Sequence, residues 1–474
     1  MSRRKKNKSL PAQPATPPVA AKPWARRFQN AVLWSAGLFP VGLVLGNVVF
    51  EALAALTVLF WLLSLAVERQ NPIPYLKKHP LVIPWLAWYC VIVLSLVVNG
   101  PGSKGAGHDV AFVRDVLFGF ALLDIGRKRP ELARFVVRGM AGAVILAAFN
   151  TVFAHLVGFD PVMRPLEAYT KKLGISPQIS GVAIYAVSFF GVLAACDAGL
   201  SVKSRRIYAV IAIIAMLQLF QIHSRTPIAA AFCGLVFGLW RGRARGSGSA
   251  LGPLLAGVFL GGAVATVFLL RLWDIASVYD RLYIWKVSWG IFLDNPILGV
   301  GVSSFRDAFA EISTHGLVEG VLDPSGRLFQ KPLETHAHNL VLMLLSSTGI
   351  LGLLAFGWLF VRACGMIWKA PKGLRLGLAG WPVALLVLGI SGENIYYSWY
   401  HALVSYLFAL AGSILMHTIR NPATADRRAA PALYCPESGF PPHRSHSTAL
   451  DQPVRGRAFR PLVAHRQASS YGGP

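Results

Sequence analysis

Apolar residues in this chain come in long blocks, not in the alternating pattern of strands or the one-sided pattern of surface helices. Most blocks run for about 17–25 residues, the length that an α-helix needs to cross the hydrocarbon core of a bilayer. The pattern predicts an all-α polytopic membrane protein with about 12 transmembrane helices. The predicted spans are 31–48, 49–67, 81–99, 108–125, 134–157, 179–197, 207–223, 226–240, 251–271, 338–362, 376–391 and 402–417.

Composition excludes a soluble globular protein. The 474 residues are 54% hydrophobic and only 14% charged, which is too little charge to cover the surface of a soluble chain of this length. The five cysteines lie inside apolar blocks or in the tail, without the spacing of a zinc site or a redox pair. We therefore expect neither disulfides nor a thiolate metal centre.

Positive charge lies in the short gaps between the apolar blocks. The first thirty residues hold eight basic residues and no acidic one, and further basic clusters lie at 77–78, 126–130, 203–206, 241–246 and 369–375. This distribution is typical of cytoplasmic loops, so both termini are predicted to be cytoplasmic. The net charge of +25 is then expected to contact anionic lipid headgroups and not nucleic acid.

The domain organisation follows from these blocks. Residues 1–30 are predicted to be a basic, disordered cytoplasmic leader, and 418–474 a disordered cytoplasmic tail without periodic apolar residues. Residues 31–271 should form transmembrane helices 1–9, and 338–417 helices 10–12. Between them, 272–337 is one large outward-facing loop, and loops of this length are usually functional.

Part of this loop has a helical pattern. Residues 277–294 place four large apolar side chains at helical spacing: Leu282, Trp285, Trp289 and Phe292. Two tryptophans on one face are typical of a helix lying in the membrane interface. The stretch "NPILGVG" at 295–301 should end this helix, because Pro296, Gly299 and Gly301 break regular structure. The loop is therefore predicted to be partly helical.

Four ionisable residues lie at the expected outer ends of spans or helices: Arg225, Arg281, His338 and Glu393. Ionisable residues at membrane depth are costly and by default mark a functional site. Each also has a structural explanation. Arg225 can reach the headgroups, Arg281 can be a solvated interfacial charge, and a neighbour can satisfy His338 at a helix start. For Glu393, pairing with a nearby arginine is favoured over catalysis.

A metal site is not expected. His336 and His338 are two residues apart, so on a helix they point to different faces, although in an extended lead-in they could share one. No third ligand is evident from the sequence. Phosphate-cradling and hydrolase motifs are missing as well.

The residues at the outer ends fit transfer from an activated, lipid-linked donor. The outer face has no nucleotide supply, so a donor there must carry its own leaving group, as a lipid-linked pyrophosphate sugar does. Arginine binds pyrophosphate through paired charged hydrogen bonds, and histidine accepts a proton from a hydroxyl near neutral pH.

These residues resemble the O-antigen ligase/polymerase family, the membrane glycosyltransferases of WaaL and Wzy type. The family pattern is Arg, Trp, Pro-x-x-Gly-x-Gly-x-x-x-Phe, then His-x-His-Asn leading into a span. The matching stretches are "DRLYIWKVSWGIFLDNPILGVGVSSF" (280–305) and "HAHNLVLMLLSSTGILGLL" (336–354). The "SRTP" element with Arg225 is similar to the family's first essential arginine. The sequence is closest in pattern to a ligase, because only one exported loop is large and extra C-terminal spans are missing.

The resemblance implies a mechanism and a location. Arg225 and Arg281 would hold undecaprenyl pyrophosphate, and His338 would act as base on a sugar hydroxyl of lipid A-core, with His336, Asn339 and Glu393 as possible supporting residues. The transfer would invert the anomeric centre without metal or cofactor. It would take place at the periplasmic face of the bacterial inner membrane, in lipopolysaccharide biosynthesis.

Other readings of the same residues are a Wzy-type polymerase, a protein O-glycosyltransferase of this family, and a transporter of lipid-linked glycans. Transporters often have broken helices and charged sites near the bilayer midplane. Here the charged residues gather at one interface, which argues against transport.

Overall fold

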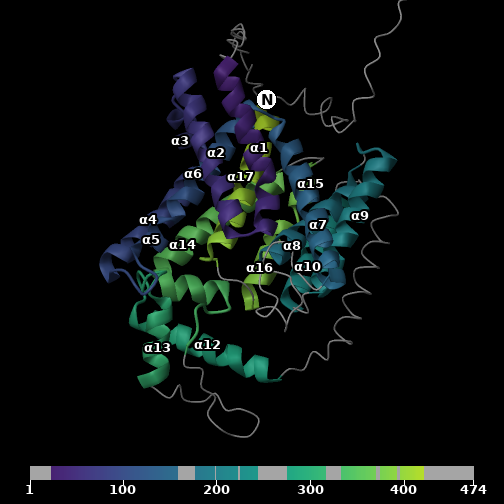
Figure 1. Ribbon diagram of the computed structural model, residues 1–474. Helices are drawn as coiled ribbons and strands as arrows, with labels where there is room; N and C mark the ends of the chain where they lie inside the picture. The colour runs from purple at the N-terminus through teal and green to yellow at the C-terminus, as the bar shows by residue number, and fades with distance from the viewer. Residues whose placement is uncertain are drawn as a thin grey trace, which may run out of the picture. The chain divides into compact units, whose positions relative to one another are not determined.

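The computed structural model describes residues 23–157, 177–197, 199–221, 225–243, 275–315, 333–369, 374–391 and 395–420. All of these residues belong to one unit of the chain, Met1–Ala432. Within the described residues every regular element is an α-helix, as the apolar pattern predicts (Figure 1).

The helices have the following bounds. The first group is α1 (Pro23–Leu45), α2 (Asn47–Glu68), α3 (Ile73–Lys78), α4 (Val82–Asn99), α5 (Ala106–Val110), α6 (Phe112–Lys128), α7 (Leu132–Val157), α8 (Pro177–Cys196), α9 (Val202–Gln221) and α10 (Arg225–Arg243). The second is α12 (Ile275–Asp294), α13 (Phe305–His315), α14 (Leu340–Lys369), α15 (Leu374–Leu378), α16 (Trp381–Ser391) and α17 (Ser398–Arg420).

Six described helices are long and apolar enough to cross a membrane, which identifies a multi-pass membrane protein. They are Pro23–Leu45, Asn47–Glu68, Val82–Asn99, Leu132–Ala154, Ile179–Cys196 and Leu340–Trp368, and two shorter apolar helices are Thr226–Gly242 and Leu376–Ile390. Three further predicted spans coincide with α6, α9 and α17, which are outside that set of six. The predicted span at 251–271 lies outside the described residues. The count of twelve remains a prediction.

Two boundaries predicted from the sequence are wrong. Residues 23–30, assigned to the disordered leader, form the first turns of α1. Proline is favoured at the start of a helix, and Arg27 stacks over the Trp24 ring at 4.6 Å, so the basic residues here are compatible with a helix. Residues 418–420, assigned to the tail, are the end of α17. The rest of the leader and tail lies outside the described residues.

The loop at 272–337 contains two described helices. The predicted helix at 277–294 is confirmed as α12, whose Leu282, Trp289 and Leu293 are exposed while Tyr283 and Ile284 are buried. The second helix, α13, was not predicted. It is amphipathic and buries Phe305 and Phe309 while Arg306 is exposed.

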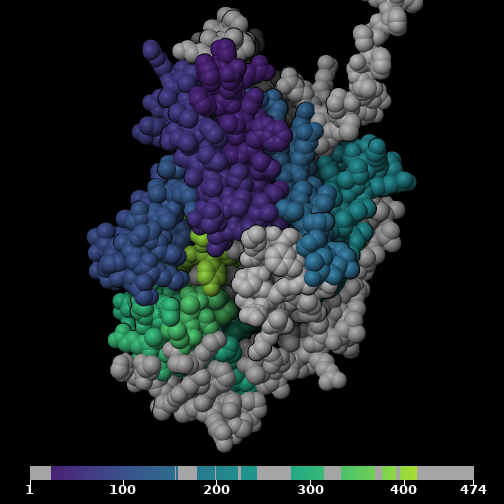
Figure 2. Space-filling view, viewed as in Figure 1, coloured from purple at the N-terminus to yellow at the C-terminus, as the bar shows by residue number. Residues whose placement is uncertain are grey.

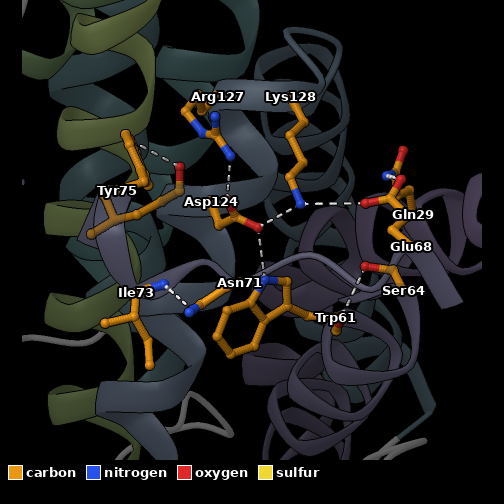
Figure 3. Close-up of polar contacts among 11 residues, drawn as sticks. Gln29, Trp61, Ser64, Glu68, Asn71, Ile73, Tyr75, Asp124, Arg127 and Lys128 are labelled. Atoms are coloured by element: carbon orange, nitrogen blue, oxygen red, sulfur yellow. Dashed lines mark hydrogen bonds and ion pairs between the residues drawn. The ribbon is translucent and has the colours of Figure 1, made fainter. Parts of the chain in front are cut away.

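The helices at the α3 end are joined by a polar cluster (Figure 3). Buried Asp124 of α6 accepts a hydrogen bond from Trp61 of α2 at 3.0 Å and pairs with Arg127 and Lys128, both at 2.9 Å. Lys128 also lies 3.6 Å from Glu68 of α2. Because the buried carboxylate is paired and hydrogen-bonded, the cluster is a structural link between α2 and α6.

Helix α14 is interrupted at Gly349, whose φ of 64° and ψ of −167° are not helical. The break frees backbone groups on both sides, and the stretch 296–301 satisfies them. Val300 and Gly301 donate to the carbonyls of Ser346 and Ser347, both at 2.9 Å. In return, Ile350 and Leu351 donate to the carbonyls of Pro296 and Ile297 at 2.9 and 3.3 Å. An irregular backbone inside a span needs such partners, because lipid offers none.

The glycines of this junction are required by close backbone contact. A Cβ on Gly349 would lie 2.2 Å from the carbonyl oxygen of Ile297, and one on Gly299 would lie 2.4 Å from the backbone of Ser347. Helix α4 adds two side chains: Ser95 donates to the Leu298 carbonyl at 2.7 Å and Asn99 to the Gly299 carbonyl at 2.9 Å. The stretch 295–301 therefore ends α12, as predicted, and fastens it to the broken helix α14.

Candidate active site

His338 lies immediately before α14 in a backbone conformation that histidine rarely adopts. Its φ is 47°, in the left-handed region; this costs a residue with a side chain about 1–3 kcal/mol and persists only where the surroundings enforce it. The neighbours supply that constraint. Ala337 is fully buried and its N–H points to the sulfur of Met343 at 3.5 Å, while Asn339 starts the helix.

Asn339 caps α14. Its side-chain oxygen accepts a hydrogen bond from the N–H of Leu342 at 3.1 Å, as an N-cap residue does. Its side-chain nitrogen donates to the carbonyl of Ile390, near the end of α16, at 3.1 Å. The asparagine therefore fixes both the start of α14 and the position of α16 through these two structural contacts.

The imidazole rings of His336 and His338 lie together, with their centroids 3.9 Å apart. Of the two alternatives left open by the sequence, different faces on a helix or a shared face in a lead-in, the structure shows the second. Residues 333–339 precede the helix, and the left-handed turn at His338 rotates its ring back toward His336.

Three further side chains surround this pair. The hydroxyls of Tyr397 and Thr335 lie 2.9 and 3.0 Å from Nδ1 of His336. The carboxylate of Glu334 lies 3.7 Å from Nδ1 of His336 and 4.0 Å from Nε2 of His338. Sequence reasoning missed all three. For Glu334 and Thr335, the only indication in the sequence was their position next to the histidines. For Tyr397 there was no indication, because it lies 61 residues from His336 in the chain.

His338 is the more open of the two histidines. Its side chain is 30% exposed, whereas those of His336 and Glu334 are each 12% exposed. The partly exposed His338 ring thus has the Glu334 carboxylate 4.0 Å from its Nε2.

Arg225 is the first residue of α10, and the structure describes its backbone only. Helix α10 packs against α16 and runs antiparallel to the segment 376–384, since Gly234 faces Gly380 and Ala384 whereas Gly242 faces Leu376 of α15. Arg225 and Ile390 lie about equally far along their helices from the Gly234–Gly380 contact. The start of α10 is thus level with the end of α16 that Asn339 contacts.

Arg281 lies in α12 and is half-buried. Helix α12 packs against α14 and α13, and Figure 1 shows it running across the end of the helices next to α13. The elements that carry Arg225, Arg281 and His338 thus gather at one end. Glu393 lies outside the described residues.

Most of the residues described above lie in one stretch of the chain, and this stretch matches a known family. Residues 207–357 match the O-antigen ligase family. The matched O-antigen ligase segment covers about a third of the chain and contains Arg225, Arg281, His336, His338 and Asn339. A comparison with curated proteins found no match.

The family resemblance inferred from the sequence is confirmed by this match. The O-antigen ligase family implies ligase or polymerase-type activity of a membrane glycosyltransferase, with lipid-linked glycan and lipid A-core as partners in general. The segment also holds Glu334 and the junction between 296–301 and α14, whereas Tyr397 comes from outside it. Helix α14 packs against α17, the last described helix, and Figure 2 shows green residues beside a yellow-green patch on the visible face.

Proposed function

We propose that this protein is an O-antigen ligase that transfers a glycan from undecaprenyl pyrophosphate to lipid A-core at the periplasmic face of the inner membrane. The observation that carries the proposal is the half-exposed His338 imidazole. A strained backbone and a capped helix hold it at the end of the helices where α10 and α12 place the two arginines. The O-antigen ligase family match supports the same reaction class.

In this reaction His338 accepts the proton of the acceptor hydroxyl. The oxygen then bonds to the anomeric carbon as the bond to the pyrophosphate oxygen breaks, and undecaprenyl pyrophosphate leaves. A single direct displacement inverts the configuration at the anomeric carbon. General base catalysis of this kind contributes about 10²–10⁴ in rate. Glu334, 4.0 Å from the His338 Nε2, stabilises the imidazolium that forms.

Arg225 and Arg281 hold the pyrophosphate. Guanidinium groups bind phosphate oxygens through paired, charged hydrogen bonds and keep their charge at every physiological pH. The negative charge on the leaving group grows as the glycosidic bond breaks, so fixed positive charges stabilise the transition state more than the bound donor. No metal is needed for this neutralisation.

The position of the site fits two lipid-anchored substrates. Helix α12 presents exposed Leu282, Trp289 and Leu293, which suits a helix lying in the membrane interface. A base located beside an interfacial helix meets a donor and an acceptor that are both held at that depth. This explains the presence of a histidine at the start of an apolar span.

Transfer by the purified full-length protein tests the proposal. The protein is given undecaprenyl-pyrophosphate glycan together with lipid A-core, free repeat units or an exported protein acceptor. We expect a covalent glycan–lipid A-core product with inverted configuration, formed by the wild type in the presence of EDTA.

The other outcomes replace the proposal by its alternatives. Extension of free repeat units identifies a polymerase, and a glycosylated protein identifies a protein O-glycosyltransferase. Movement of the donor across vesicle membranes without any covalent product identifies a transporter. Each of these results contradicts the ligase assignment.

A further inference from the structure

Glu334, His336 and His338 form a donor set that the sequence did not reveal. One ligand atom from each, a carboxylate oxygen and two imidazole nitrogens, all lie within 4.8 Å of one another, and all three side chains are partly buried. The sequence offered two histidines and no third ligand. Folding brings Glu334 to both rings.

The distances suit one cation. Ligands about 2.0–2.1 Å from a tetrahedral Zn²⁺ lie roughly 3.3 Å from one another, and no two can exceed about 4.2 Å. Glu334 is 3.7 Å from the His336 nitrogen and 4.0 Å from the His338 nitrogen. These two distances involve different carboxylate oxygens, and the three ligand atoms lie within 4.8 Å of one another. Side-chain rotations that shorten the longest separation by up to about 1.5 Å therefore bring one oxygen and two nitrogens to coordination distance.

The surroundings orient the ligands as outer-shell partners do in metal sites. Tyr397 and Thr335 place their hydroxyls at Nδ1 of His336, where the ring N–H can donate to them while Nε2 binds the cation. The left-handed backbone of His338 turns its ring toward His336. The 30% exposure of the His338 side chain leaves room for water or another ligand at a fourth position. The three ligand side chains are thus already neighbours before any ion binds.

We propose that Glu334, His336 and His338 bind one Zn²⁺ or a similar transition-metal cation, and that the bound cation inhibits glycosyl transfer. Two imidazoles and a carboxylate favour Zn²⁺ over Mg²⁺ or Ca²⁺, which require mostly oxygen ligands. The inhibition rests on the proposed function. An imidazole whose lone pair is bound to a cation does not accept a proton, so a base and a metal ligand exclude each other at His338.

Binding is tested first, and independently of activity. Full-length protein in detergent is stripped with EDTA, freed of the chelator and titrated with Zn²⁺ against a competing dye. We expect one Zn²⁺ per chain. Glu334→Gln and His336→Ala should each weaken binding at least about tenfold, and Tyr397→Phe should weaken it by about tenfold through the lost outer-shell contact.

His108→Ala is the matched control. His108 is also half-exposed and also lies beside a carboxylate, 3.2 Å from Asp109, but it lacks a second imidazole. Its replacement should leave the affinity unchanged. The proposed site is wrong if no stoichiometric binding is seen, or if His108→Ala weakens binding as much as His336→Ala. Co²⁺ titration supplies a second readout, because four-coordinate Co²⁺ absorbs strongly in the visible range and Glu334→Gln should abolish that band.

Transfer is measured second. We expect Zn²⁺ to inhibit the wild type at the concentrations where it binds, EDTA to reverse the inhibition, and Mg²⁺ to have no effect. Zn²⁺ binding without inhibition would support the metal site but would contradict the proposed inhibition of glycosyl transfer. Loss of transfer in EDTA, restored by Zn²⁺, overturns metal-independent transfer. Binding by a protein that transfers to no acceptor rejects the proposed function and keeps the site.

Discussion

The ring centroids of His336 and His338 lie 3.9 Å apart, and only Ala337 separates the two residues in the chain. A left-handed turn at His338 and the capping of α14 by Asn339 produce this proximity. The two imidazoles therefore share one environment with Glu334.

Replacement of His338 should reduce turnover far more than donor binding. His338→Gln and His338→Ala should each lower transfer by about 10²–10⁴ at saturating substrates, because neither side chain accepts the proton. Donor affinity, measured by direct binding of the lipid-linked glycan, should change little. Near-normal transfer by His338→Gln would show that His338 only positions a substrate, and the base would then have to be sought at Glu393 or in the substrate.

Lysine should be a poor substitute at the two arginines. Arg225→Lys and Arg281→Lys keep the charge but lose the paired hydrogen bonds to pyrophosphate, each of which contributes about 1.5–3 kcal/mol. At limiting donor we expect transfer to fall by about 10–150-fold. Initial rates at several donor concentrations check this. The control is Arg306→Lys, at an exposed residue of α13. Full activity of Arg225→Lys would favour an arginine that only reaches the headgroups.

The loop that carries α12 and α13 should be periplasmic. The basic gaps between spans predict cytoplasmic termini, and an odd number of spans then separates each of them from Ala310. A reporter that is active only outside the cytoplasm, fused at residue 310, should be active, and the same reporter at residue 205 should be silent. The opposite pattern would place the candidate site on the cytoplasmic side and remove the proposed donor.

The junction between α12 and α14 should not tolerate a side chain at Gly349. Gly349→Ala adds a Cβ only 2.2 Å from the Ile297 carbonyl oxygen at a φ of 64°, so we expect a loss of more than about 2 kcal/mol. Gly357→Ala, in the same helix with nothing within 4 Å of its Cβ, is the matched control and should be neutral or stabilising. Thermal unfolding midpoints in detergent distinguish the two. Equal midpoints would show that the junction yields easily.

Acid should destabilise the fold through His79, which lies between α3 and α4. Burial lowers the pKa of His79 from 6.5 to about 4. As the pH falls from 6.5 to 4, the unfolded state binds the proton and the folded state does not, so stability is lost across this window. The slope is at most about 1.4 kcal/mol per pH unit. Unfolding midpoints at pH 7 and pH 4.5 should differ less in His79→Gln than in the wild type.

The sequence by itself determined the class of the protein and most of the candidate residues. Blocks of apolar residues predict membrane helices because lipid leaves a backbone no partner outside its own helix, and that reasoning needs no tertiary information. It also predicted α12 and its end at 295–301, since Trp, Pro and Gly act locally. Arg225, Arg281 and His338 stood out because charged and titratable groups are rare at such places.

Only the tertiary structure decided what these residues meet. The sequence predicts a turn at Pro296, Gly299 and Gly301. In the fold this stretch forms backbone hydrogen bonds with α14 where that helix is interrupted, some fifty residues later. Tyr397 reaches His336 across 61 residues, and Glu334 joins the histidines through a left-handed turn that no helical or extended periodicity contains. Local propensity is set by neighbours in the chain, but the partner of a freed carbonyl or an imidazole nitrogen is set by packing between distant segments.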